Sequence, residues 1–383
     1  MYKNLKIGYV PYNTDLSHPD DRRRFPYFAK RNNVQFEIAD SNKFYDVILL
    51  PAPANLTKWL LYKKKNPQTR FVFEMVDSLI YQSDTFNTLF KGVGRFVLGK
   101  ESLPSVNHKD VLIKWLKIAD VVMCSSEKIK EDIQKWNSNV VVSLDYLEHE
   151  YQFTKTDYSI KGKMKLLWEG QGVIVPHFLH FKSMFERVSS FCELHVVTSN
   201  SFPKYGQFVK QDVATFLQQL PIDTHFHKWD MNKNSILFSQ LDCGIIPLDN
   251  RNNYGWHKPA NKLISFWLSG LPTLTSNTPA YIDAAGEMSN DILCADEDDW
   301  VEKLHKLREM KTEERAFLAK DNFDYAKSLY SNESHDSIWV NLFENLCKTQ
   351  PLLAEPIWPE YIMNPSLAGQ VLRGSFSGHS VFG

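Results

Sequence analysis

Short apolar runs alternate with longer amphipathic stretches along most of this sequence, and this rhythm limits the folds that the chain can adopt. The apolar runs are rich in β-branched and aromatic residues and do not alternate strictly between apolar and polar positions. Runs of this kind are typical of parallel strands covered by helices on both faces. The predicted strands are residues 6–10, 34–38, 47–50, 71–73, 121–124, 140–143, 165–168, 194–198, 243–247 and 272–274.

The stretches between these runs carry helical patterns, for example at residues 126–136, 207–218, 296–310 and 334–347. Strands that alternate with helices predict βαβ units and a doubly wound α/β fold. The rhythm is interrupted once, at residues 148–163, which are polar and charged and predict a linker. We therefore expect two Rossmann-like domains, at residues 1–155 and 156–347, and a C-terminal extension at 348–383. A length of 383 residues fits two domains of roughly 100–200 residues each.

Composition excludes several classes of protein. The formal net charge is -1, whereas a general nucleic-acid binder normally has a strong basic excess. No apolar stretch approaches the roughly 18–20 residues of a membrane-spanning helix. The five cysteines are scattered and never form a C-x-x-C pair, and the N-terminus has no signal-peptide pattern. These features predict a soluble cytoplasmic protein.

The charge is divided unevenly between the two halves. Residues 1–150 hold 22 Lys and Arg against 18 Asp and Glu, a net of +4, so the remainder carries -5. Arg22, Arg23 and Arg24 form one basic run, and residues 63–65 form another after the aromatic stretch 59–62. One hypothesis is contact with the inner face of a membrane or with an anionic acceptor. The alternative is a solvated helix end.

The most informative segment runs from Asp242 to Thr273 and reads as strand, polar loop, helix, glycine and next strand. Two Rossmann-like domains bind ligands at the carboxyl ends of their strands, in the cleft expected between them. Pro259 suits the first helical turn and Gly270 suits the position just past the helix end. A helix N-terminus near residues 260–263, flanked by Lys258 and Lys262, would favour an anion such as a diphosphate. The alternative is an ordinary surface helix with solvated lysines.

These residues resemble a known family. The segment CGIIPLD…KPANKLISFWLSGLPTLTS is similar to the donor-binding segment of GT-B glycosyltransferases of the glycosyltransferase 4-like group. Residues 119–133 resemble the strand and helix near the end of the N-terminal domain in that group, and residues 165–172 resemble the strand that opens the C-terminal domain. The resemblance extends to about residue 347. It implies a GT-B fold, with an acceptor domain followed by a nucleotide-sugar donor domain.

The resemblance also implies an activity, the transfer of a sugar from a nucleotide-sugar donor to an acceptor hydroxyl with retention of configuration. Lys258 and Lys262 would stabilise the leaving diphosphate without a metal ion, and no cofactor is required. The carbohydrate or lipid-linked acceptor implies a role in surface polysaccharide or glycoconjugate synthesis. The donor-binding residues implied are Gly170, Gln171, Tyr254, Lys258, Asn261, Lys262, Leu263 and Ser265.

The sequence departs from the family pattern at several positions. His257 and Ser265 stand where many members have a pair of glutamates, the second of which binds the nucleotide ribose. Gln171 follows Gly170 where an arginine is common, and no lysine follows until Lys182. These departures leave two alternatives: a non-catalytic nucleotide- or sugar-binding relative, and a nucleotide-sugar epimerase or hydrolase on the same fold.

In the N-terminal half, Glu74 and Asp77 lie at the end of the predicted strand 71–73. Two carboxylates at a strand end can orient an acceptor hydroxyl or act as a general base, so both join Lys262 as catalytic candidates. The alternative is a pair that caps a loop. The histidines predict no metal site, because His177, His225, His227 and Asp230 are too dispersed along the sequence.

Overall fold

The computed structural model describes residues 2–76, 79–81, 95–96, 98–103, 108–204, 209–249 and 253–353. The chain forms two compact units, and each is described by itself. The first comprises Met1–Ser125, Ile129–Ser143 and the chain from Asp336 onward. The second comprises Ser126–Lys128 and Leu144–His335. The domain limits at residues 155 and 347 stay predictions.

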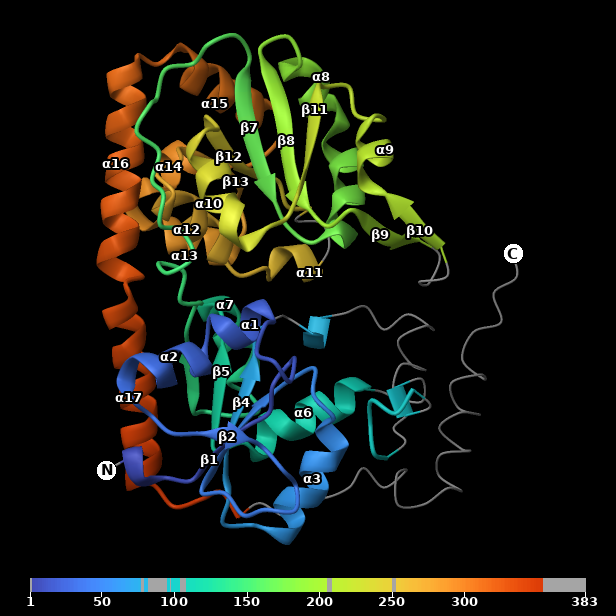
Figure 1. Ribbon diagram of the computed structural model, residues 1–383, viewed down its shortest axis with the longest axis vertical. Coiled ribbons are helices and arrows are strands. Elements are labelled where there is room, and N and C mark those ends of the chain that lie inside the picture. The colour runs from blue at the N-terminus through green and yellow to red at the C-terminus, as the bar shows by residue number, and fades with distance from the viewer. Residues whose placement is uncertain are drawn as a thin grey trace. The chain divides into compact units, whose positions relative to one another are not determined.

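The first unit is built on a six-stranded parallel sheet with the order β2-β1-β3-β4-β5-β6 (Figure 1). Each strand run predicted in this half overlaps one of its strands, and the α/β class is confirmed. All residues of β3 and β5 are buried, as expected for strands covered on both faces. The strands are β1 (Ile7–Tyr9), β2 (Glu37–Ile38), β3 (Val47–Pro51), β4 (Arg70–Met75), β5 (Val121–Cys124) and β6 (Val140–Val142).

One hydrophobic cluster joins this sheet to three helices, through side chains such as Trp59, Trp115 and Ile129. These helices are α3 (Leu56–Lys65), α6 (His108–Ile118) and α7 (Glu127–Ile133). The unit also contains η1 (Tyr2–Asn4), α1 (Pro19–Arg22), α2 (Phe25–Asn32) and η2 (Leu79–Tyr81).

The last described helix, α17 (Asn332–Lys348), contributes to the first unit through aromatic side chains. Trp339 lies with its ring centroid 5.6 Å from that of Phe25 and 5.7 Å from that of Phe28. Phe343 stacks on Tyr2 at 5.7 Å and on Phe28 at 6.1 Å. Aromatic pairs in these arrangements add to the stabilisation from buried area. A segment from the far end of the sequence thus completes the core of the first unit.

The second unit has its own six-stranded parallel sheet, with the order β11-β8-β7-β12-β13-β14. A short antiparallel pair, β9 (Ser201–Lys204) and β10 (Val209–Asp212), stands apart from it. The sequence did not predict β9, β10, β11 or β14. The strands of the large sheet are β7 (Met164–Glu169), β8 (Cys192–Thr198), β11 (Thr224–Lys228), β12 (Cys243–Ile246), β13 (Thr273–Ser276) and β14 (Leu293–Cys294).

Helices cover both faces of this sheet (Figure 1). On one face Leu166 and Trp168 of β7 join a cluster with η3 (Gly172–Phe181), α8 (Lys182–Val188), α9 (Val213–Leu217) and α15 (Glu297–Glu309). On the other face Leu167 and Val197 join a second cluster. Its helices are α10 (Met231–Ser239), α12 (Asn261–Leu268), α13 (Pro279–Ala285), α14 (Ser289–Ile292) and α16 (Thr312–Leu329). The short elements α11 (Asn253–Trp256) and η4 (Gly286–Met288) complete the unit.

One predicted helix is wrong over much of its length. Residues 207–218 were expected to be helical, but α9 begins only at Val213. Asp212 ends the strand β10 and its carboxylate accepts a hydrogen bond from the Thr215 N–H, which fixes the start of the helix.

The basic-aromatic stretch of α3 is largely internal. Lys63 is only 1% exposed; its ammonium group donates to the Thr69 carbonyl at 2.7 Å and lies 3.6 Å from the Asp120 carboxylate. Burial lowers the pKa of Lys63, and the Asp120 charge opposes this shift. Trp59 and Tyr62 are core residues. Because Lys63 is also buried, only Lys64 and Lys65 of the basic run are exposed.

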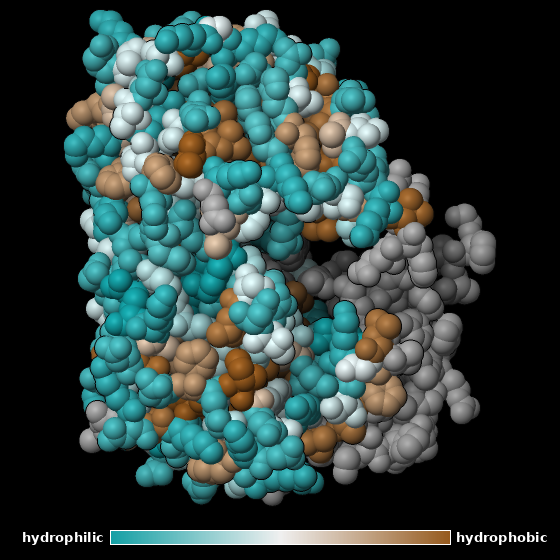
Figure 2. Space-filling model, in the orientation of Figure 1, coloured by the Kyte–Doolittle hydropathy of each residue, from teal (hydrophilic) through white to brown (hydrophobic). Residues whose placement is uncertain are grey.

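No helix in the described ranges is long and apolar enough to cross a membrane. On the face drawn in Figure 2, hydrophobic side chains form small separate groups among hydrophilic ones.

We predict that Lys63→Ala lowers the free energy of unfolding by about 3 kcal/mol, because it leaves the buried Asp120 carboxylate without its cation. Lys64→Ala, one residue along the same helix, is the matched control and should change stability by less than about 0.5 kcal/mol. Urea unfolding of both variants measures the difference. Equal stabilities would contradict a structural role for Lys63.

Candidate functional site

The strand order of the second unit reverses direction at β7. This strand pairs with β8 on one side and with β12 on the other. In open α/β sheets, ligands bind outside the carboxyl ends of the strands at such a switch point. The segments that leave this point are Glu169 to Gln171 after β7 and the chain that leads from β12 to α12.

The start of α12 lies at this end of the sheet. The helix begins at Asn261, two residues later than the position that Pro259 suggested, with Ala260 as its N-cap. The N–H groups of Leu263 and Ile264 both bond to the Ala260 carbonyl. The N–H groups of Asn261 and Lys262 have no acceptor among the described residues. Two donors therefore remain available at the positive end of the helix dipole.

The helix ends as the sequence predicted. Gly270 has a φ of +70°, the left-handed conformation that glycine adopts most easily. The Leu271 N–H then bonds to the Phe266 carbonyl at 3.0 Å, which closes the helix.

The ammonium group of Lys262 places a positive charge at the switch point. Its ammonium group lies 4.7 Å from the centre of the Trp168 ring, a cation–π contact. A methyl side chain at position 170, in place of the hydrogen of Gly170, would come within 2.5 Å of this ammonium and 2.8 Å of the Trp168 ring. Gly170 thus allows the amine to lie directly against the backbone that follows β7.

The electrostatic environment compensates this cation only in part. Burial lowers the pKa of Lys262, the Glu169 charge opposes this shift, the Lys258 charge adds to it, and the resulting pKa is about 8. Within the described part of the chain, Lys262 makes no ion pair or hydrogen bond through its ammonium group. A partly buried cation without an ion pair and two open N–H donors at the same helix start are groups that suit an anion.

Tyr281 of α13 is a second polar group near Glu169. It is buried, and this burial together with the Glu169 charge raises the pKa of its hydroxyl. No sequence pattern pointed to Tyr281 or to the contact of Trp168 with Lys262, because both depend on tertiary packing.

Three of the predicted donor-binding residues of α12 already serve the fold. The Asn261 side-chain oxygen accepts from the Asp145 N–H at 3.1 Å. Leu263 is a core residue. The Ser265 hydroxyl is buried and donates to the Asn261 carbonyl at 2.9 Å, so it forms a bond within the helix. Their roles in donor binding stay predictions.

The remaining donor-binding candidates differ in exposure. Gln171 is exposed at the start of η3, and Lys258 is half-buried shortly before α12. Tyr254 belongs to α11, and its side chain lies outside the described residues.

Of the two catalytic candidates in the first unit, one is buried and the other lies outside the described residues. Glu74 is 1% exposed, and its carboxylate pairs with the buried Arg24 at 3.0 Å. The same guanidinium donates to the Ser143 carbonyl at 3.3 Å. Asp77 lies outside the described residues. A catalytic role for either carboxylate stays a prediction.

Comparison with known proteins identifies the fold. No family model and no curated protein matches the sequence. Anabaena HepE, in complex with UDP and glucose, is 12% identical and matches with a TM-score of 0.58 over 90% of this chain and 100% of its own. Sucrose-phosphate synthase from Thermosynechococcus elongatus is 11% identical, with a TM-score of 0.57 over 89% of this chain and 81% of that one.

A third structure, an alpha-glucosyltransferase in complex with UDP, is 10% identical and matches with a TM-score of 0.53 over 89% of this chain and 100% of that one. These structures are GT-B glycosyltransferases. Likeness at such low identity establishes architecture, and the chain has the GT-B fold that its sequence suggested.

We predict that Lys262→Met stabilises the unliganded protein at pH 7 by about 1–2 kcal/mol, because it removes a partly buried, unpaired charge. The folded chain releases this proton near pH 8 and the unfolded chain near 10.5, so the folded chain binds fewer protons between these values. The contribution of Lys262 to the free energy of unfolding therefore rises with pH in that range. The advantage of the variant should shrink from pH 7 to pH 10 in urea unfolding. A variant less stable than the parent at pH 7 would contradict the prediction.

Proposed function

We propose that this chain is a glycosyltransferase that binds the diphosphate of a nucleotide-sugar donor at the start of α12. The observation that carries the proposal is that the start of α12 combines the Lys262 ammonium, which makes no ion pair among the described residues, with the open N–H groups of Asn261 and Lys262. The fold supports it, since Anabaena HepE was solved with UDP-glucose and the alpha-glucosyltransferase with UDP.

The proposed chemistry is electrostatic. As the bond between the sugar and the diphosphate breaks, negative charge grows on the leaving oxygen. A cation and backbone donors already fixed around that position stabilise this charge without reorganisation. The contact with Trp168 and the absence of a side chain at Gly170 hold the Lys262 amine in place for this task. In this scheme the protein supplies the positive charge itself, and neither a metal ion nor a cofactor is required.

The finer parts of the proposal rest on the sequence resemblance. They are retention of anomeric configuration, a hydroxyl of a carbohydrate or lipid-linked molecule as acceptor, and a role in polysaccharide or glycoconjugate synthesis. Asp77 and Glu74 are the proposed groups that orient the acceptor. The proposed place of action is the cytoplasm, at the inner face of the membrane.

We predict that Lys262→Met raises the Kd for UDP about tenfold or more, because a charge-assisted bond to phosphate is lost. Binding of uridine, which lacks the diphosphate, should not change. Affinity of the parent protein for UDP should also fall as the pH rises from 7 to 9, since the pKa of Lys262 is about 8 and the amine loses its charge in this range. Isothermal titration calorimetry measures all three effects.

Lys320→Met is the control for this experiment, because Lys320 is an exposed lysine on α16 that pairs with Asp324. It should leave the affinity and its pH dependence intact. A thermal-shift screen with GDP, ADP and CMP tests the choice of base in parallel. Unaltered UDP affinity in Lys262→Met would refute the proposed site. Binding of donors with no sugar transfer to any acceptor would favour a non-catalytic relative instead.

Membrane contact has a separate test. We predict that Lys64→Glu combined with Lys65→Glu abolishes flotation of the protein with vesicles that contain anionic lipid, since each basic residue near such a surface contributes about 1 kcal/mol. Lys63 is kept, because it is part of the core. Flotation of the double variant at the level of the parent protein would end this part of the proposal.

A further inference from the structure

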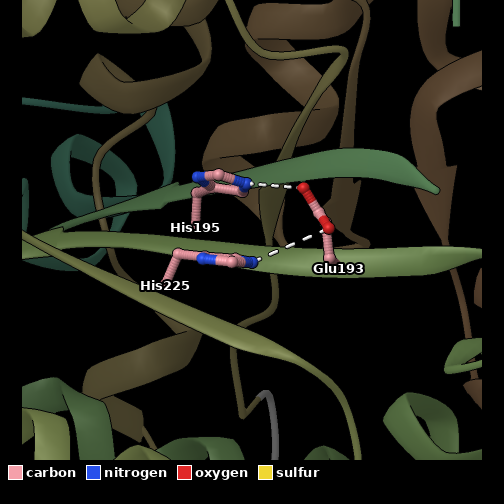
Figure 3. Close-up of side chains that lie close together, drawn as sticks. All are labelled: Glu193, His195 and His225. Carbon is pink, nitrogen blue, oxygen red and sulfur yellow. Dashed lines mark hydrogen bonds and ion pairs between the residues drawn. The ribbon is translucent and has the colours of Figure 1, made fainter. Parts of the chain in front are cut away.

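A carboxylate and three histidines share one face of strands β8 and β11. His195 of β8 is the direct neighbour of His225 of β11, with the two strands parallel. Glu193 precedes His195 by two residues and His227 follows His225 by two. Because side chains alternate along a strand, all four project from the same face. Figure 3 shows the imidazoles of His195 and His225 extending in parallel toward the Glu193 carboxylate between their ends.

The distances in this group are compatible with a metal ion bound between the three side chains. The Glu193 carboxylate lies 3.1 Å from His195 Nε2 and 3.7 Å from His225 Nε2. All three potential ligand atoms lie within 4.8 Å of one another. A tetrahedral zinc ion with bonds of about 2.0–2.2 Å places its ligands about 3.3–3.6 Å apart. Small side-chain movements would therefore bring all three atoms to bonding distance.

His227 provides the hydrogen bond that such a site requires. Its Nε2 lies 2.9 Å from His195 Nδ1. If His195 binds a metal through Nε2, its Nδ1 carries the proton and donates it to His227. Histidines that bind metals generally donate their other N–H to a neighbouring acceptor in this way, which fixes the tautomer and the ring orientation.

The members of the group differ in their exposure to solvent. The side chains of His195 and Glu193 are only 11% and 20% exposed, whereas that of His225 is 48% exposed. The group is therefore preformed on the inner strand and open to solvent on the outer one.

We propose that Glu193, His195 and His225 bind one divalent transition-metal ion, with zinc as the best match and water as the fourth ligand. A set of two nitrogens and one carboxylate oxygen suits zinc, whereas magnesium and calcium prefer oxygen ligands alone. The ion joins β11, the edge strand of its sheet, to β8. It would cross-link the edge strand to its neighbour on this face of the sheet. The site is separate from the proposed diphosphate site at Lys262.

The test is a titration of the full chain, freed of metal by a chelator, with ZnCl2. We expect one zinc ion per chain by isothermal titration calorimetry. We also expect a rise in Tm of roughly 5 °C or more when zinc exceeds its Kd a hundredfold. His225→Gln and Glu193→Gln should each weaken zinc binding at least tenfold and remove the rise in Tm. His225→Gln is the safer variant, because His225 is exposed and its loss leaves the core intact.

His305→Gln is the matched control, because His305 is an exposed histidine on α15 that contacts the Phe191 ring and does not belong to the group. It should bind zinc like the parent protein. The proposal is overturned if the parent protein binds no zinc at about 100 µM, which corresponds to less than about 5.5 kcal/mol of binding free energy. It is equally overturned if His225→Gln and Glu193→Gln bind zinc as tightly as the parent.

Discussion

The structure depends on one constraint, the need of parallel strands to be covered on both faces. β7 shows this directly, with Leu166 and Trp168 directed to one cluster and Leu167 to the other. Helices must therefore lie on both sides of the sheet, and only the strand ends remain for polar groups. The position of Lys262 follows from that arrangement. It stands where α12 begins and where the strand order reverses, so the packing of the core determines the place of the cation.

We expect the cation at this place to destabilise the unliganded folded protein. Its ammonium group lies against Trp168 and the Gly170 backbone and makes no ion pair with any described residue. The folded protein therefore carries a partly buried charge that lowers its stability, and a bound anion would relieve this effect. Sites that sacrifice stability in this manner are typical of preorganised binding and catalysis, because the protein has oriented its charges before the ligand arrives.

The fold could be predicted from the sequence because strand burial is a local pattern. The apolar run at β12 and the glycine after α12 both lie where they were expected. Two features of the site could not be predicted. The Ser265 hydroxyl bonds to a carbonyl of its own helix, and the contact of Trp168 with Lys262 depends on tertiary packing. The sequence predicted no metal site because its histidines are dispersed along the chain. The pairing of β8 with β11 brings His225 beside His195, and β11 was not among the predicted strands.

The aromatic contacts of α17 determine when the first unit can complete its folding. Trp339 and Phe343 cover Phe25 and Phe28, yet about 300 residues separate the partners along the chain. At roughly 5–20 residues per second, a ribosome needs on the order of 15–60 s to make that length of chain. During this interval the rings of Phe25 and Phe28 lack their final cover. The half of the molecule that is synthesised first is thus completed last, after the second unit has already emerged.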